Sequence, residues 1–239
     1  MRSILALLPF TIRQRVKKRF CVPDMRLSLE RMRRNGFAPR VAIDIGAFEG
    51  EWTRMVVEVF PGSRVLMVEP QASKRPLLER VIADIPGTRH EQVLLGARVE
   101  DQMRFHEIES ASSVLDEHVN RHDVSSYLPM TTLDRLTAGS DFSSPDLLKL
   151  DVQGYELEVL RGAEIPLRHA EAVILEVSLL GIHVGAPLFA EVVAFMAQRA
   201  FRVYDIPSFF RRPFDDALFQ VDLIFVAERS PLVASHRWD

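Results

Sequence analysis

The sequence contains only one cysteine, Cys21, so it can form neither an internal disulfide nor a zinc site built from several thiolates. It has no stretch of about 20 consecutive apolar residues, the length that a helix needs to cross a bilayer. Internal repeats and low-complexity segments are also absent. These absences argue against a disulfide-stabilised secreted domain, a membrane-spanning helix and a repeat array. The scarcity of cysteine favours a reducing compartment, and we expect the protein to be cytoplasmic.

The composition is that of a folded α/β domain. Apolar residues make up 47% of the 239 residues and charged residues 26%, which are ordinary values for a globular protein. Short apolar runs alternate with segments of helical periodicity, which is typical of a parallel sheet flanked by helices. A chain of this length fits one large α/β domain, and a second domain is not required.

Seven strands are expected in one sheet. They lie at residues 40–45, 64–68, 90–95, 147–150, 172–177, 201–206 and 222–227, with the last two as an edge pair. Helices are expected at residues 23–35, 49–60, 73–84, 133–136, 155–160 and 187–199. The periodicity is weak between residues 102 and 123, where we expect a hairpin and a mobile loop.

The charges are distributed unevenly along the chain. Residues 1–40 contain 11 lysines and arginines but only two acidic residues, whereas the remainder carries a net charge of −12. The first ten residues resemble the start of a signal peptide, but the apolar run is short, lacks a small-residue cleavage site and is followed at once by basic residues. We therefore expect residues 1–39 to form a basic amphipathic helical extension, and residues 40–239 to form the catalytic domain.

The basic extension has several candidate partners. An anionic membrane surface, nucleic acid or the acidic face of a second subunit would each complement its charge. A solvated or subunit-packing helix is the favoured interpretation. We expect no nucleic-acid partner, while peripheral membrane contact through this helix and a homo-oligomer stay open.

The most informative segment is residues 41–50, VAIDIGAFEG. An apolar strand leads into Asp44 and then into a glycine turn before a helix, which lets backbone N–H groups and a helix N-terminus approach a ligand closely. Gly46 permits a contact that a Cβ would block. A dinucleotide fingerprint has a glycine at the third position of this turn, where this chain has Phe48. Asp44 repels phosphate but suits a cationic group such as the α-amino group of S-adenosylmethionine.

A second acidic residue follows the next strand. Glu69 comes 25 residues after Asp44, and a carboxylate at that position can accept two hydrogen bonds from a ribose diol. Asp44 and Glu69 are therefore the candidate ligands for the amine and the ribose of a nucleoside. The alternative is that each caps a helix or pairs with an arginine.

Two further carboxylates end strands in the second half of the chain. Asp151 ends the fourth strand, within LKLDVQGYE, and Glu176 ends the fifth. Open α/β sheets place their ligands at this edge, and Gly154 allows the chain to turn beneath a substrate. Buried carboxylates at adjacent strand ends would have raised pKa values, as a general base requires, although they could equally hold a metal or an arginine.

Several short motifs together resemble the FkbM family of S-adenosylmethionine-dependent methyltransferases. They are D-I-G-A-x-x-G from Asp44 to Gly50, Glu69-Pro70, Ser112-Ser113-Val-Leu, Thr132-Leu-Asp, and LKLDVQGYE followed by VLRGA. They occur in order over about residues 40–227. The family commonly has Glu where this chain has Gln153.

The resemblance implies a class I methyltransferase fold, Rossmann-like, with a seven-stranded mostly parallel sheet and flanking helices. It also implies methylation of a hydroxyl on a sugar, glycan or polyketide-type metabolite. The cofactor would be S-adenosylmethionine. The residues expected to bind it are Asp44, Gly46, Ala47, Gly50, Glu69, Pro70, Ser112, Ser113 and Asp151. One of the two serine hydroxyls would contact the adenine or the methionine end, although serines of this kind also simply form turns.

Methyl transfer to a hydroxyl requires the nucleophilic oxygen, the methyl carbon and the sulfonium sulfur to be nearly collinear, so positioning is the main task. A base within hydrogen-bond reach of the hydroxyl assists. The candidates are Asp151, Glu156, Glu176 and His183, and Asp151 is the preferred one. A lone loop histidine such as His183 is more often just exposed.

Metal binding is an alternative that we do not favour. Asp151 and Glu176 together would suit Mg²⁺, and His118 with His122 would suit a transition metal. The segment around the two histidines is highly polar and only weakly periodic, which favours a solvated loop, so we expect no metal site.

Two other functions compete with an O-methyltransferase. A nicotinamide-dependent Rossmann oxidoreductase is disfavoured by the missing glycine and by the absence of an obvious Tyr-x-x-x-Lys pair. A non-catalytic nucleoside-binding or membrane-associated protein is supported by the basic arm. The acceptor is unidentified because the loops at residues 109–131 and 207–219 carry no portable motif. Within the second loop, the phenylalanines at 209, 210, 214 and 219 would line an acceptor wall, the core or a dimer seam, and Arg211 and Arg212 would suit an acidic acceptor.

Overall fold

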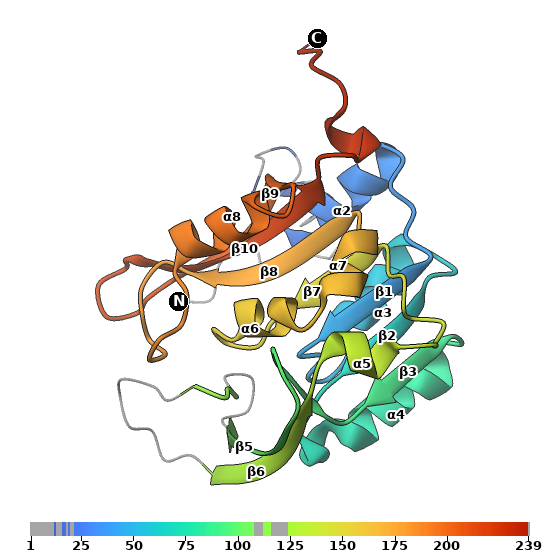
Figure 1. Cartoon of the computed structure of the whole chain (residues 1–239). Helices are drawn as coiled ribbons and strands as arrows, with labels where there is room; N and C mark the ends of the chain where they lie inside the picture. The colour runs from blue at the N-terminus through green and yellow to red at the C-terminus, as the bar shows by residue number, and fades with distance from the viewer. Residues whose placement is uncertain are drawn as a thin grey trace.

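A computed structural model describes residues 12, 16, 17, 19, 22–107, 112–115 and 124–238. Its main sheet has seven strands in the order β3–β2–β1–β7–β8–β10–β9 (Figure 1). In that order the strands are Thr88–Glu91, Arg64–Val68, Val41–Ile45, Leu147–Leu150, Ala172–Ser178, Leu218–Ala227 and Phe201–Arg211. Only β10 runs antiparallel to its neighbours, β8 and β9. The expected seven-stranded, mostly parallel sheet is confirmed.

The predicted strand at residues 90–95 is wrong, because the chain divides there between two sheets. Residues Thr88–Glu91 form β3 of the main sheet, whereas β4 (Leu94–Leu95) joins a three-stranded sheet in the order β4–β6–β5. Leu94 packs with Phe105 and Met130 of the small sheet, while Leu95 packs into the main core. Leu94 and Leu95 therefore pair with β6 of the small sheet instead of extending β3. Its other strands, β5 (Glu100–Glu107) and β6 (Val124–Thr131), pair antiparallel.

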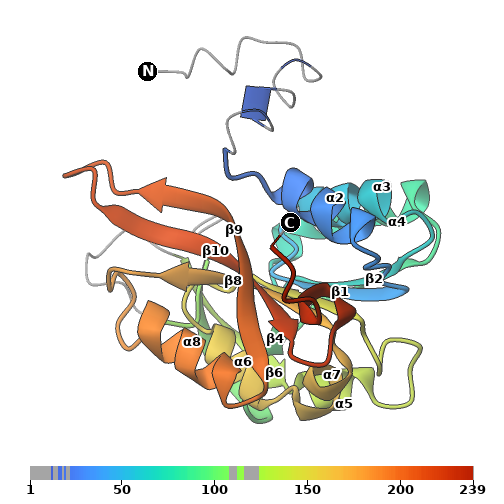
Figure 2. The same ribbon diagram turned by 90° about the horizontal axis from the view of Figure 1, so that it is seen from above.

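Helices cover both faces of the main sheet (Figure 2). One face carries α2 (Met25–Arg34), α3 (Glu51–Val59) and α4 (Arg75–Asp84), and the other carries α5 (Leu133–Thr137), α6 (Glu156–Arg161), α7 (Glu164–His169) and α8 (Phe189–Ala197). Along β1, Val41, Ile43 and Ile45 face the second set and Ala42 faces the first. This burial on both faces explains why the central strands are almost entirely apolar. Among the α-helices of the described residues, α7 alone was absent from the sequence prediction.

The N-terminal helix α2 is packed into the domain. Leu29, Met32 and Phe37 are buried in the same cluster as α3 and α4, and Arg31 forms an ion pair with Asp205 of β9. The hydrophobic core therefore continues across the predicted boundary at residue 39. Among the residues that the structure describes, no helix is both long enough and apolar enough to cross a bilayer.

Candidate active site

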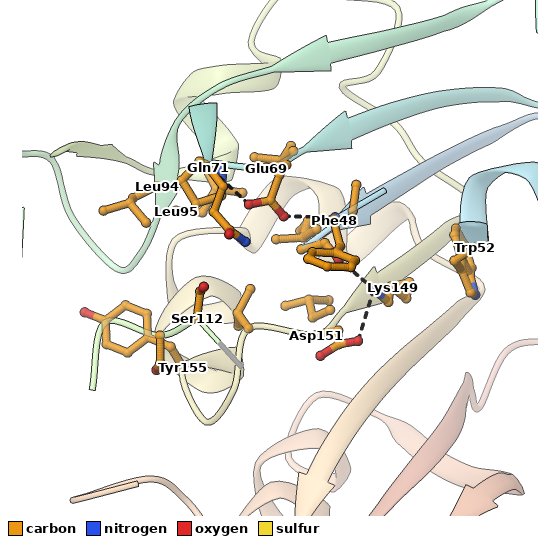
Figure 3. A pocket seen from close by; sticks show the side chains of 18 of the residues that line it. Phe48, Trp52, Glu69, Gln71, Leu94, Leu95, Ser112, Lys149, Asp151 and Tyr155 are labelled. Atoms are coloured by element: carbon orange, nitrogen blue, oxygen red, sulfur yellow. Dashed lines mark hydrogen bonds and ion pairs between the residues drawn. The ribbon is translucent and has the colours of Figure 1, made fainter. Parts of the chain in front are cut away.

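A cavity of about 470 Å³ opens where the central parallel strands end. Three segments that follow strands line it: residues 46–49 after β1, residues 69–71 after β2 and residues 151–152 after β7. Segments from the small sheet close one end, including Leu94 and Leu95, and Trp52 of α3 stands at the other (Figure 3). Open α/β sheets bind their ligands at this edge.

The turn after β1 is held by its backbone. The N–H groups of Gly46 and Ala47 both donate to the carbonyl of Val68 at the end of β2, at 2.9 and 3.2 Å. Gly46 has a φ of +75°, and a Cβ added there would lie 1.9 Å from the carbonyl oxygen of Asp151. Only glycine lets the β1 and β7 loops approach this closely. Gly46 and Ala47 line the cavity, whereas Gly50 lies behind it and packs against α4.

Glu69 lies in the cavity wall with its orientation fixed. It is 3% exposed, and its two oxygens accept hydrogen bonds from the backbone N–H groups of Phe48 at 2.9 Å and Gln71 at 3.0 Å (Figure 3). Burial raises the pKa of Glu69, and the hydrogen bonds from Gln71 and Phe48 oppose that effect. Each carboxylate oxygen has further acceptor capacity, which suits a diol. Pro70 lines the cavity beside it.

Asp44 does not line the cavity. It is fully buried beneath the turn, where it accepts a hydrogen bond from Thr53 Oγ1 at 2.7 Å and lies 3.3 Å from Lys149 Nζ. The structure therefore does not bring Asp44 and Glu69 together on one wall. The carboxylate of Asp44 reaches the cavity only through Lys149.

Lys149 forms part of the cavity floor, and sequence analysis gave it no role. Its ammonium donates to the carbonyl of Gly46 at 3.0 Å and lies 3.4 Å from Asp151 Oδ2 (Figure 3). Burial by itself lowers the pKa of Lys149, but Asp151 and Asp44 raise it above its ordinary value, so the group is a cation. The available signal was a lysine inside the buried strand LLKL, which needs charged partners.

Asp151 faces the cavity, and Gln153 connects it to Glu176. The Nε2 group of Gln153 donates to Asp151 Oδ1 at 3.0 Å and to Glu176 Oε2 at 2.6 Å. Burial and the nearby Asp151 raise the pKa of Glu176 well above its ordinary value. Glu176 therefore holds its proton to a higher pH than an ordinary glutamate does.

Asp222 is a further carboxylate at this site that sequence analysis missed. It lies opposite Glu176 in the β8–β10 register, lines the cavity and accepts a hydrogen bond from Ser208 Oγ. Burial raises the pKa of Asp222. An acidic residue within the apolar strand QVDLIFVA was the available signal, but the pattern does not say which cavity it faces.

Glu156 and His183 lie behind the loop at residues 151–155 and do not line the cavity. Oε1 of Glu156 accepts hydrogen bonds from the backbone N–H groups of Val152 and Gly154, at 3.0 and 3.1 Å. Burial raises the pKa of Glu156 to about 7. His183 is buried near Gly154 rather than exposed. Both side chains are therefore placed to support the loop that carries Asp151.

Both predicted serines line the cavity from the side of the small sheet. Ser113 Oγ donates to the carbonyl of Gln153 at 3.0 Å and accepts from the N–H of Leu115, also at 3.0 Å. It joins the small sheet to the loop at residues 151–155. Ser112 stands beside Tyr155, with its hydroxyl at the cavity (Figure 3).

The other sequence candidates lie elsewhere. Phe209, Phe210 and Phe214 are exposed on the β9–β10 hairpin, and neither they nor Phe219, Arg211 and Arg212 line the cavity. His118 and His122 fall outside the described residues. Within the described part of the chain, no three His, Cys, Asp or Glu side chains form a group that could hold a metal ion.

Comparison with known proteins identifies the family. A model of the methyltransferase FkbM domain matches residues 44–203. No curated protein matches the sequence.

Several solved structures have a similar chain trace. The magnesium protoporphyrin IX methyltransferase of Synechocystis PCC 6803 is 10% identical, with 95% of this chain and 85% of that chain covered and a TM-score of 0.49. The precorrin-6y C5,15-methyltransferase of Geobacter metallireducens GS-15 is 12% identical, with 84% and 85% covered and a TM-score of 0.47. The 1,6-didemethyltoxoflavin-N1-methyltransferase of Burkholderia thailandensis is 10% identical, with 90% and 83% covered and a TM-score of 0.46.

The family match includes the turn after β1, Glu69 and the segment around Asp151, which are the parts that form the cavity. In the main sheet the antiparallel strand β10 lies between β8 and the edge strand β9. This is the class I methyltransferase topology. The chain therefore belongs to the FkbM family of S-adenosylmethionine-dependent methyltransferases.

Proposed function

We propose that this protein transfers the methyl group of S-adenosylmethionine to a hydroxyl oxygen of a small-molecule or glycan acceptor, such as a sugar or a polyketide-type metabolite. One observation carries the proposal: a single cavity joins the buried carboxylate of Glu69 to the Asp151–Lys149 pair. The proposal therefore puts the nucleoside site and the base for the second substrate in one continuous cavity. We also infer a cytoplasmic location from the single cysteine, Cys21.

The donor end fits a nucleoside that has no phosphates. Glu69 would accept hydrogen bonds from the ribose diol, and Leu94 and Leu95 would contact the adenine face. The methionine portion would lie along the backbone of Gly46 and Ala47, which line the cavity. Asp44 acts indirectly in this arrangement, because its carboxylate fixes the Lys149 ammonium that supports the Gly46 carbonyl.

The donor supplies an electrophilic methyl carbon, and the protein supplies position and a base. Asp151 would accept the proton of the acceptor hydroxyl as the oxygen–carbon bond forms and the carbon–sulfur bond breaks, with sulfur keeping the electron pair. Lys149, 3.4 Å from Asp151, forms an ion pair with that carboxylate and holds it at the cavity. Gln153 holds Asp151 in place from the other side.

Calorimetric titration tests the donor. S-adenosylhomocysteine is expected to bind and to raise the melting temperature, whereas NAD⁺ is not. Binding of NAD⁺ alone would favour the nicotinamide oxidoreductase instead.

Methyl transfer tests the chemistry. The protein is incubated with methyl-labelled S-adenosylmethionine and a panel of glycosides, cyclitols and hydroxylated macrolides. Asp151→Asn is expected to bind S-adenosylhomocysteine but to lose about 100-fold or more in turnover. Unchanged turnover would remove Asp151 from the mechanism, and an absence of transfer to every hydroxyl compound would favour a binding protein.

A further inference from the structure

The hairpin formed by β9 and β10 extends beyond the sheet to which it belongs. Strand β8 ends at Ser178, which pairs with Gln220, so among the described residues no strand other than β9 pairs with β10 closer to the turn. Figure 2 shows this part of the hairpin reaching beyond the rest of the sheet. We call residues 209–219 the hairpin tip.

Three phenylalanines make the hairpin tip apolar. Phe209 and Phe210 are 48% and 53% exposed, and Phe214 is 87% exposed. Successive residues of a strand point to opposite faces, so Phe209 and Phe210 leave both faces of the tip apolar. Large apolar side chains exposed together in this way mark a surface that contacts another protein or a membrane.

Strand pairing with another chain is disfavoured at this edge of the sheet. β9 is the edge strand, but Pro207 has no N–H to donate, and the register of the β9–β10 pair shifts between Asp222 and Ile224. Interruptions of this kind protect an edge from pairing. A partner of the hairpin tip would therefore contact its side chains rather than extend the sheet.

The neighbouring helix α2 supplies positive charge beside the hairpin. Its apolar residues, including Leu29 and Met32, are buried in the core. The last turn of α2 carries three exposed arginines, Arg31, Arg33 and Arg34. The outer surface of α2 is therefore cationic and takes no part in the core.

The arginines of α2 are held against the hairpin. Arg31 forms an ion pair with Asp205 of β9. A cavity of about 400 Å³ lies between α2 and β9, and its charged lining consists of Lys17, Arg31, Arg34 and Asp205. Three cations face one carboxylate there, so this cavity suits a phosphate group.

An anionic phospholipid surface matches both features. Its phosphates complement the arginines of α2, and the boundary between headgroups and acyl chains takes up phenylalanine side chains. At the tip itself Arg212 pairs with Asp215, so the tip contributes apolar contact rather than charge. A second copy of this chain would bring the same arginines to a shared interface, where like charges repel each other.

We propose that the hairpin tip and the arginines of α2 together form a surface that binds an anionic phospholipid bilayer. Phe210 and Phe214 enter the boundary between headgroups and acyl chains. Arg31, Arg33 and Arg34 lie against the lipid phosphates. The bilayer is contacted from one side only, and the surface acts whatever the methyl acceptor is.

Flotation with lipid vesicles tests the surface. Full-length protein is mixed with vesicles of phosphatidylcholine alone, or of phosphatidylcholine and phosphatidylglycerol in equal parts, and the bound fraction is measured. Binding to the vesicles that contain phosphatidylglycerol is expected, and it should weaken as salt is added. A lack of binding to these vesicles would overturn the proposal.

A double variant separates the hairpin from the basic N-terminal segment, which attracts anionic lipid by charge alone. Phe210→Ser combined with Phe214→Ser is expected to weaken vesicle binding about tenfold or more, because two apolar side chains no longer leave water. Tyr127→Ser is the matched control, because Tyr127 is 65% exposed on β6 of the small sheet. Equal binding by the parent and the double variant would exclude the hairpin.

The charge of α2 has its own variant. Arg34→Gln is expected to weaken binding to the anionic vesicles about fivefold at low salt. Arg135→Gln is the control, because Arg135 is exposed on α5, which covers the other face of the main sheet. Equal effects of the two substitutions would contradict the contribution of α2.

Fluorescence gives a measurement that does not depend on a loss of binding. Phe214→Trp is made together with Trp238→Phe, since Trp238 is fully exposed, while Trp52 is buried and gives a constant background. On anionic vesicles the indole at position 214 is expected to emit at shorter wavelength and to be quenched by brominated phosphatidylcholine. Unchanged emission from vesicle-bound protein would show that the tip stays in water and would overturn the proposal.

Sedimentation velocity without vesicles distinguishes a second copy of the chain from a membrane. A parent dimer that dissociates in the double phenylalanine variant would assign the tip to self-association and overturn the membrane surface. All the variants replace exposed side chains, so their melting curves should match that of the parent.

Discussion

The two ends of the cavity are built in different ways. The Glu69 end consists of two short contiguous segments, residues 46–49 and 69–71, tied to each other by backbone hydrogen bonds. The other end is lined by Met25 of α2, Trp52 and Met55 of α3 and Asp222 of β10, which are far apart in the sequence, and we call it the Trp52 end. The first end holds its ligand-binding carboxylate, Glu69, by peptide N–H groups, which most side-chain substitutions leave in place. The second can change its ligand through single side chains.

The largest expected effect lies at the junction of the two ends. Lys149→Met removes the cation between Asp44 and Asp151 and leaves a fully buried carboxylate without its ion-pair partner. We expect the free energy of unfolding to fall by about 3–5 kcal/mol, measured by urea denaturation. Arg54→Met breaks the surface pair with Asp84 and should cost less than about 1 kcal/mol.

A further variant sharpens this prediction. If the loss arises from the unpaired carboxylate, Asp44→Asn combined with Lys149→Met should recover part of it. Equal losses in the free energy of unfolding for Lys149→Met and Arg54→Met would contradict the prediction, because the buried ion pair would then contribute no more than a surface pair.

The loop behind Asp151 should show a pH dependence. The pKa of Glu156 is raised from 4.5 to about 7 in the folded protein, so between these values the folded state holds a proton that the unfolded state has lost. The free energy of unfolding therefore falls as the pH rises from about 4.5 to about 7. Glu156→Gln keeps an oxygen for the N–H groups of Val152 and Gly154 but does not titrate.

This variant is expected to match the parent at pH 4 and to exceed it by about 3 kcal/mol at pH 8. Urea denaturation across that pH range gives both curves. A difference that does not change with pH would show that Glu156 acts through its shape alone.

A smaller effect is expected on ligand affinity at the Glu69 end. Glu69→Gln weakens two charge-assisted hydrogen bonds and turns an amide N–H₂ toward the N–H of Phe48 or Gln71. We expect S-adenosylhomocysteine to bind about 10–100-fold more weakly by calorimetry. Glu91→Gln is the matched control, because Glu91 is exposed at the end of the adjacent strand β3. Similar losses in both variants would contradict ribose binding by Glu69.

The smallest effect is expected outside both ends. Phe214 is 87% exposed on the β9–β10 hairpin, so Phe214→Ser should change the free energy of unfolding by less than about 0.5 kcal/mol and leave donor affinity unaltered. Sedimentation velocity should also be unchanged. A shift to a smaller species would instead identify the hairpin as a dimer contact.

Local patterns account for what the sequence predicted well. Apolar periodicity located six of the seven strands of the main sheet and most helices, because burial on one or both faces leaves a mark within each segment. It failed at residues 90–95, where Leu94 and Leu95 pack in different clusters. Their partners, including Met130, lie far along the chain.

Asp44 and Glu69 show the same limit within the site. Both are acidic residues near the ends of neighbouring strands, yet Asp44 is still inside β1, opposite Met67, whereas Glu69 lies beyond the end of β2. Alternation along β1 therefore turns Asp44 toward Thr53 and Lys149, and only Glu69 reaches the cavity wall. In the β1–β2 register Glu69 lies two positions beyond Asp44, so the distance of each residue from the strand end decides which one reaches the cavity.

The sequence by itself determined the α/β architecture, the glycine turn and the presence of carboxylates at the strand ends, because these depend on periodicity and turn chemistry within a few residues. Only the tertiary structure decided which side chains share the cavity. No common local pattern marks Lys149, Trp52 and Asp222. They line one cavity because of the strand order and the helix packing. Those are set by contacts between distant segments, which no single segment of the sequence encodes.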